Sequence, residues 1–191
     1  LAASMTLDAG NTDKLAMFAA EARKSGIRVL PPCVNASAVE FIAEPPKKAE
    51  AHGAIRYALA ALKNIGASAV ETIVESRNAK GSYKSLSDFA ARINTKAVNK
   101  RALETLAAAG AFDAFEPSRA LVYANVEGMI ALANRISDNA ALGTSDLFGG
   151  AGDSAATLDL KAAEAWTPMD KLQKEFDAVG FFLSGHPLDQ Y

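Results

Sequence analysis

Apolar residues recur at helical spacing along most of this chain, above all after residue 67. Val70, Ile73 and Val74 fall on one face of a helix, and similar spacing continues in the segments that follow. Polar caps and glycine stops mark the helix ends. The pattern predicts helices over residues 11–25 (capped by Asn11), 67–79, 85–93, 99–109 and about 117–141, with stops at Gly26, Gly81 and Gly110, and a last helix from Thr167-Pro168 to Val179.

Three short segments before residue 63 have a different pattern. The run "IRVLPP" ends at a proline pair, and proline keeps the residue before it out of the helical region. The run "SAVEFIAEPP" alternates apolar and polar residues as a short strand does, and "AIRYALAAL" can pair with it before turning helical. Residues 143–165 lack periodicity and are rich in Gly, Ala, Ser and Asp, which is typical of a flexible linker.

Composition narrows the class of protein. Half of the 191 residues are apolar and only 7% are aromatic, which favours helices built on Ala, Leu, Ile and Val. A single cysteine excludes a disulfide within the chain, and two histidines are too few for a zinc-ligand cluster. No apolar run reaches the roughly 20 residues that span a bilayer. We therefore expect a cytoplasmic protein with no membrane partner, and, since the chain starts at Leu1, a piece of a longer one.

Charge is unevenly distributed along the chain. The net charge of −2 hides a neutral stretch over residues 1–76, a stretch of +6 over residues 77–101 and one of −8 over residues 102–191. A solvated helical face is the usual meaning of a run of charge. The basic stretch also has the sign that a polyanion partner needs.

The basic stretch begins where an interrupted helix ends, in "LKNIGASAVETIVESR". A glycine-containing break between two short helices is either an ordinary turn or a helix-hairpin-helix phosphate site. In the second case the first N–H groups of the new helix are free and lie at its positive end. The backbone of Gly66, Ala67 and Ser68 would hold the phosphate, with Lys63 and Arg77 as nearby charges. Asn64 stands where the usual hairpin has its first glycine, and Asn tolerates the left-handed conformation.

A second unit of the same kind is expected in "SLSDFAARINTKAVNKRALETLAAAGAFD". Its turn contains Lys96, Lys100 and Arg101, so two hairpins would give two phosphate contacts. The alternative is a packed four-helix cluster with a polar loop. The predicted fold class is therefore mainly α: a helix-hairpin-helix cluster, a small β or extended element near residues 27–60, and a flexible linker.

Several motifs, in order, make the whole chain resemble the alpha subunit of bacterial replicative DNA polymerase III. They are "MTLDAGNTDKLAMFAAEARKSG", "GIRVLPPCVNAS", "IRYALAALKNIGASAVETIVESRN", "VNKRALETLAAAGAFDAF" and "GFFLSGHPLDQY". The resemblance implies four parts: the end of the fingers region (1–30), a helix-hairpin-helix DNA-binding region (31–118), a long helix and flexible linker (119–165), and a helix leading into a C-terminal OB-fold domain (166–191).

The resemblance also implies a DNA-directed DNA polymerase, a nucleotidyltransferase. In that family, Mg²⁺-bound carboxylates in a palm domain transfer the nucleotide. No pair of close aspartates on a strand is recognisable in this sequence; Asp170 and Asp177 fall on a helical pattern and suit caps or surface charges. The chain should therefore bind and position DNA without a cofactor of its own, and should be inactive alone.

The resemblance also implies a second binding partner for this chain, through a short peptide in the linker. Alpha subunits carry a peptide at this place that docks on the sliding clamp, with Gln first and an aliphatic-Phe pair last. Leu147 and Phe148 match that pair, whereas Thr144 replaces Gln and loses an amide that both donates and accepts. The expected clamp-binding residues are Thr144, Ser145, Asp146, Leu147 and Phe148.

The sequence thus predicts a polymerase fragment that binds double-stranded DNA, a primer-template, through phosphates and is tethered to the sliding clamp, alongside other replicase subunits. One alternative is a free-standing helix-hairpin-helix module of the repair type, which would need a catalytic set near the hairpin. Another is a protein-interaction scaffold, favoured if the basic stretch is paired with the acidic half. The expected DNA-binding residues are Lys63, Asn64, Gly66, Ala67, Ser68, Arg77, Lys96, Lys100 and Arg101.

Overall fold

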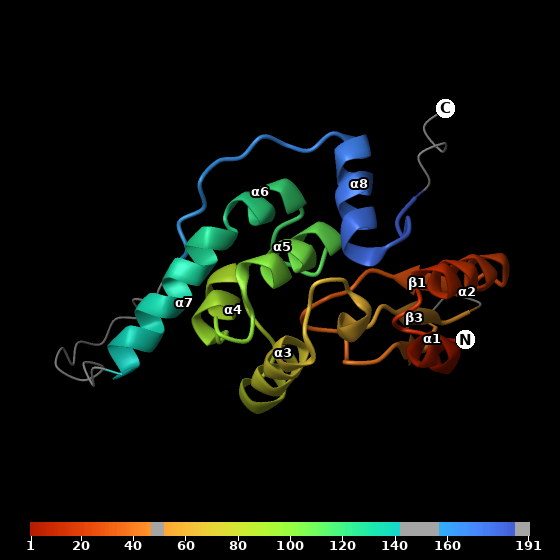
Figure 1. The fold of residues 1–191 in the computed structure, drawn as a ribbon, viewed down its shortest axis with the longest axis horizontal. Coiled ribbons are helices and arrows are strands. Elements are labelled where there is room, and N and C mark those ends of the chain that lie inside the picture. The colour runs from red at the N-terminus through yellow and green to blue at the C-terminus, as the bar shows by residue number, and fades with distance from the viewer. Residues whose placement is uncertain (47–51, 142–156, 186–191) are drawn as a thin grey trace.

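The chain is mainly helical, with one small sheet (Figure 1). The structure is a computed structural model that describes residues 1–46, 52–141 and 157–185. The sheet and the first two helices lie at one end, and α8 stands between them and the other helices (Figure 1). In chain order the elements are α1 Ala2–Leu7, α2 Thr12–Lys24, β1 Arg28–Leu30, β2 Ile42–Glu44, β3 Ala54–Arg56, the 3₁₀ turn η1 Leu59–Ala61, α3 Ala67–Lys80, α4 Leu86–Arg92, α5 Lys100–Ala109, α6 Arg119–Ala124, α7 Val126–Ala141 and α8 Pro168–Val179.

The three predicted extended segments form the sheet, which confirms them. The strand order is β1-β3-β2, with β1 parallel and β2 antiparallel to β3. Arg56 ties the strands together, because its guanidinium donates to Glu44 at 2.7 Å and to the carbonyl of Pro31 at 3.1 Å. The chain turns helical at η1, directly after β3, as the pattern indicated.

Local caps fix most helix boundaries where the sequence placed them. Asn11 caps α2, Asn99 caps α5, and Thr167 forms a capping box with Asp170 at the start of α8. Gly110 ends α5 with a φ of +89°, a conformation that suits glycine. Asp170 is thus a cap, one of the two roles expected for it. The short helix α1 had no predicted counterpart.

The long helix predicted from about residue 117 to 141 is wrong in its first part. Ser118 caps a short α6, and the chain breaks at Asn125 before α7 begins. Asn125 is buried, and its side-chain amide donates to the carbonyls of Leu121 and Lys161 and accepts the N–H of Lys161, each at 2.8 Å. At the break, Asn125 therefore provides both a donor and an acceptor for the backbone of Lys161, which lies 36 residues further along the chain.

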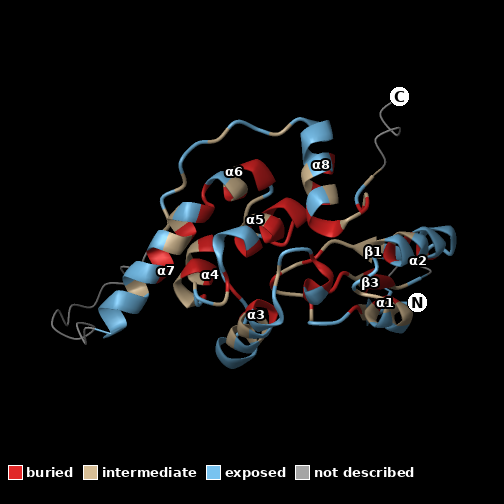
Figure 2. Ribbon diagram, in the orientation of Figure 1, coloured by how far each residue is buried: buried red, intermediate tan, exposed pale blue. Residues whose placement is uncertain are grey.

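The core is centred on α5, which is buried over most of its length (Figure 2). This helix packs against α6, α7 and α8. Phe89 of α4 extends the core, because its ring meets those of Tyr83 and Phe112 edge-on at 4.9 Å. The last part of α7 is exposed and stands away from this core (Figure 2). Apolar burial around α5 therefore positions the helical hairpins.

Residues 157–166, which we call the strap, cross the helical body without regular secondary structure. Leu158, Leu160 and Trp166 pack against the core, and the Leu158 N–H donates to Ser87 at 2.9 Å. The Trp166 ring lies 5.4 Å from that of Tyr123, so this tryptophan anchors the end of the strap to α6. The C-terminal part of the predicted linker is thus bound to the body.

Candidate nucleic-acid interface

The first hairpin joins η1 to α3 through residues 62–66. Asn64 has a φ of +60°, so it adopts the left-handed conformation expected at the first glycine position. Gly66 is the N-cap of α3 with extended backbone angles, and no side chain caps the helix. Among the described residues, the N–H groups of Gly66, Ala67 and Ser68 have no bonded acceptor. All three residues are exposed, so the positive end of a 14-residue helix faces solvent.

The hairpin is held in place by α8. The N–H of Lys63 donates to the carbonyl of Ala178 at 2.9 Å, and its ammonium lies 5.7 Å from the ring centre of Phe176. Buried Leu62 and Val70 fix the two sides of the turn to the core. Sequence patterns gave no signal for this contact, because α8 lies more than 100 residues further along the chain.

Arg77 is not brought to the hairpin. It lies ten residues into α3, about 15 Å along the axis from the helix start. One terminal nitrogen of its guanidinium donates to the carbonyls of Val34 and Ser37, at 2.9 and 2.7 Å. Arg77 therefore joins α3 to the loop before β2.

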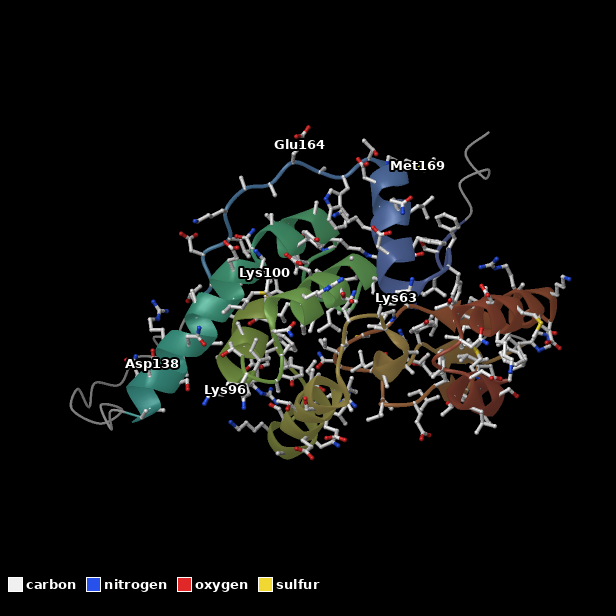
Figure 3. All side chains as sticks on the ribbon, in the orientation of Figure 1. Lys63, Lys96, Lys100, Asp138, Glu164 and Met169 are labelled. Atoms are coloured by element: carbon white, nitrogen blue, oxygen red, sulfur yellow. The ribbon has the colours of Figure 1, made fainter. Side chains whose placement is uncertain are left out.

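The second hairpin joins α4 to α5 through residues 93–99. Asn94 accepts the N–H of Lys96, Thr95 bonds Asn134 of α7, and Asn99 caps α5. The side chains of Lys96 and Arg101 are exposed. Figure 3 shows that Lys96 lies well apart from Lys63, so the predicted DNA-binding residues do not form one continuous patch.

Lys100 forms an ion pair with Glu127 of α7 and lies 4.0 Å from Glu104. The hydrogen bond to Glu127 raises the pKa of Lys100, and the same bond lowers the pKa of Glu127. Among the described residues, Lys100 is the one basic residue of the stretch 77–101 that pairs with a carboxylate of the acidic half. This single pairing leaves most of the basic stretch unpaired with that half.

Arg92 is also engaged inside the protein. Its guanidinium donates to the carbonyls of Ser76 and Gly81 at 2.6 and 2.9 Å, and it lies 4.2 Å from the ring centre of Tyr83. With Arg77 and Lys100, this makes three of the seven basic residues of the stretch bonded internally. The exposed basic residues that remain are Lys80, Lys84, Lys96 and Arg101.

Two of the predicted residues from separate hairpins share one hollow. Asn64 of the first hairpin and Arg101 of α5 line a space of about 130 Å³, together with Lys174 of α8. Lys174 was not predicted, because its place beside the hairpin depends on the packing of α8 against α5.

The remaining sequence-based expectations concern the clamp-binding peptide, metal sites and membrane-spanning helices. The clamp-binding residues 144–148 lie outside the described residues. In the described ranges, no three His, Cys, Asp or Glu side chains are grouped as a metal site requires. No helix within the same ranges has the length and apolar character to cross a bilayer.

Comparison with known proteins agrees with the two helical hairpins. The profile of the family described as "Helix-hairpin-helix motif" matches residues 26–122, about half of the chain. The chain therefore belongs to the helix-hairpin-helix motif family.

The resemblance to DNA polymerase III is also confirmed. The chain is 42% identical to DNA polymerase III subunit alpha of Caulobacter vibrioides over 188 residues, 98% of this chain and 16% of that protein. It is 36% identical to that of Vibrio cholerae and 32% identical to that of Escherichia coli K12, each over 193 aligned residues, 100% of this chain and 16% of the relative. The chain thus spans about 16% of the length of the curated relatives it matches.

Proposed function

We propose that this chain is the part of a replicative DNA polymerase alpha subunit that holds double-stranded DNA by its phosphates. The observation that carries the proposal is the exposed start of α3, where three adjacent N–H groups have no acceptor among the described residues. Backbone N–H groups at a helix N-terminus bind phosphate oxygens, and such contacts do not distinguish one DNA sequence from another. Membership of the helix-hairpin-helix family supports the same use of this turn.

The wider setting follows from the relatives. Because they are named as subunits of DNA polymerase III, we place this chain in a DNA-directed DNA polymerase of the cytoplasm, acting on a primer-template with other replicase subunits. We assign no step of nucleotide transfer to its residues, and place the Mg²⁺ of that reaction outside this segment. The contribution of this chain is to keep the duplex bound while a different part of the polymerase acts.

The hairpin is tested by adding a side chain to Gly66. A Cβ there meets no heavy atom within 4 Å, so Gly66→Val should fold normally while its methyl groups keep a phosphate from the N–H groups. We expect affinity for a labelled duplex to fall about tenfold, the equivalent of one lost hydrogen bond to a charged group. Fluorescence anisotropy measures the affinity.

Gly10→Val is the matched control, because Gly10 also has open space around it and belongs to the turn between α1 and α2, outside the hairpin residues 62–66. Wild-type affinity should fall with salt by about 0.9 logarithmic units per phosphate bound and per decade of salt. Equal affinities for wild type and Gly66→Val, or affinity that ignores salt, would show that the hairpin does not bind phosphate.

We also propose that residues 144–148 tether the polymerase to the sliding clamp. Leu147 and Phe148 form an apolar pair of the kind that fills a pocket on a partner. The described chain supports access to this peptide: the last residues of α7 before it are exposed, and this end of the helix stands away from the body (Figure 1).

The clamp proposal predicts that Leu147→Ala/Phe148→Ala weakens binding to purified clamp, by about 2 kcal/mol for each anchor removed from a desolvated pocket. Ser145→Ala/Asp146→Ala is the control and should change binding little. Titration calorimetry measures both variants. If the first variant instead lowers the unfolding temperature and leaves clamp binding unchanged, the pair stabilises the fold and is not a tether.

A further inference from the structure

The hollow beside the first hairpin is built by three elements that lie far apart in sequence. Asn64 lies in the first hairpin, Arg101 in the first turn of α5, and Lys174 in the middle of α8. Small residues, Ala108 and Ala178, form part of its wall. A space of about 130 Å³ that is lined by two cations has room for one anionic group.

Arg101 is unusual among the arginines of the basic stretch. Arg77 and Arg92 bond carbonyls of the protein itself, whereas the exposed guanidinium of Arg101 has no hydrogen bond or ion pair to the described residues. A guanidinium presents a planar fork of donors that matches two phosphate oxygens. Its donors therefore remain available for a ligand that enters the hollow.

Lys174 is positioned without a carboxylate. Its ammonium lies 4.7 Å from the ring centre of Tyr123 and 6.0 Å from that of Trp166. The ring faces hold the charge but accept none of its hydrogen bonds as strongly as an oxygen would. The strap thus helps to position Lys174, because Trp166 belongs to the strap.

Two carboxylates also line the hollow, and each has a neighbour of its own. Glu104 lies 4.0 Å from the ammonium of Lys100, and Asp177 accepts the side-chain amide of Gln173 at 3.0 Å. These contacts partly satisfy the negative groups within their own helices. Arg101 and Lys174 have no such partner among the described residues.

We infer that this hollow is a second phosphate position, which binds a backbone phosphate of the same DNA held by the first hairpin. The inference rests on the proposed function. Arg101 supplies the fork, Lys174 supplies a point charge, and the side-chain amide of Asn64, shared between hairpin and hollow, can donate to the same oxygens. The proposed DNA-binding surface then includes the start of α3, α5 and α8, and it does not include Lys96, which lies well apart from Lys63 (Figure 3).

The test is the salt dependence of binding of a labelled DNA duplex to the 191-residue chain. Arg101→Gln/Lys174→Gln should make the slope of log affinity against log salt shallower by about 1, the value for one phosphate, and lower affinity about tenfold at 0.1 M salt. Arg135→Gln/Lys171→Gln removes the same charge from exposed positions outside the hollow and should change both values much less. Arg101→Lys should keep the slope but weaken binding, since a lysine lacks the fork.

The outcomes separate this inference from the proposed function. If wild type binds no DNA, both fail. If wild type binds and Gly66→Val weakens it, but the hollow variant behaves as its charge-matched control, this inference alone is overturned. Inorganic pyrophosphate at constant ionic strength should compete no better than sulfate; strong competition that the hollow variant abolishes would assign the hollow to a free phosphate instead. Thermal melts should show each variant folded, and an unfolded double variant is replaced by Arg101→Gln alone.

Discussion

Replacing Glu175 with alanine should lower the free energy of unfolding by about 3–5 kcal/mol, because it breaks a buried ion pair and leaves two backbone N–H groups without their acceptor. Glu175 is fully buried in α8, and one of its oxygens accepts a guanidinium nitrogen of Arg119 at 3.1 Å. The other oxygen accepts the N–H groups of Leu183 and Ser184 at 2.8 and 2.7 Å. Removing the carboxylate leaves Arg119, itself buried, with only the carboxylate of Asp113 to balance its charge.

Urea denaturation of wild type, Glu175→Ala and Glu71→Ala measures this effect. Glu71 is exposed on α3, so its replacement should change stability by less than about 0.5 kcal/mol. In a double-mutant cycle, Arg119→Ala/Glu175→Ala should cost clearly less than the two single changes added together, since neither charge is then left alone. Additive costs would show that the two side chains do not stabilise each other.

Gly180→Ala should destabilise the protein by about 2–4 kcal/mol, from backbone strain and overpacking together. Gly180 ends α8 with a φ of +99°, which an L residue rarely adopts. An added Cβ would lie 2.4 Å from a methyl carbon of Thr12 and 3.0 Å from Cε of Lys63. The change should therefore also displace the first hairpin and weaken DNA binding.

Gly10→Ala is the control, because that position has open space around it and no positive φ. Urea denaturation compares the two variants, and anisotropy reports the hairpin. Adding Thr12→Ala to Gly180→Ala removes the nearest methyl group but keeps the Cβ of residue 12, 2.9 Å from the added atom, so it should recover a part of the overpacking loss and none of the strain. Full stability in Gly180→Ala would mean that the end of α8 adjusts without cost.

Features that depend on neighbouring residues could be predicted from the sequence. Asn99 and Thr167 cap their helices by accepting the backbone N–H three residues ahead, and Gly110 ends α5 by its own conformational freedom. The first hairpin is of the same kind, since the left-handed Asn64 and the N-cap Gly66 follow from turn chemistry. Local rules were enough for these elements.

Features that depend on distant partners could not be predicted. The side chain of Asn125, at the break between α6 and α7, forms hydrogen bonds with the backbone of the strap 36 residues later. Helical spacing carries no sign of this distant contact, so it predicted α6 and α7 as one helix. We predicted Arg77 as a charge beside the hairpin, yet the backbone carbonyls that accept its hydrogen bonds lie 40 and 43 residues earlier in the chain. Summed charge describes a stretch of sequence, whereas an interface depends on which guanidinium groups the fold leaves unbonded.

The contact between α8 and the first hairpin has a consequence for synthesis of the chain. The hairpin loop is complete at Gly66, but the carbonyl that fixes Lys63 and the carboxylate that holds the end of α8 belong to residues synthesised more than 100 positions later. At ~5–20 residues per second on the ribosome, that interval is roughly 5–25 s. During this time the nascent hairpin lacks its support, so a chain that stops before residue 178 carries the sequence of the DNA-binding turn without the contact that sets its shape.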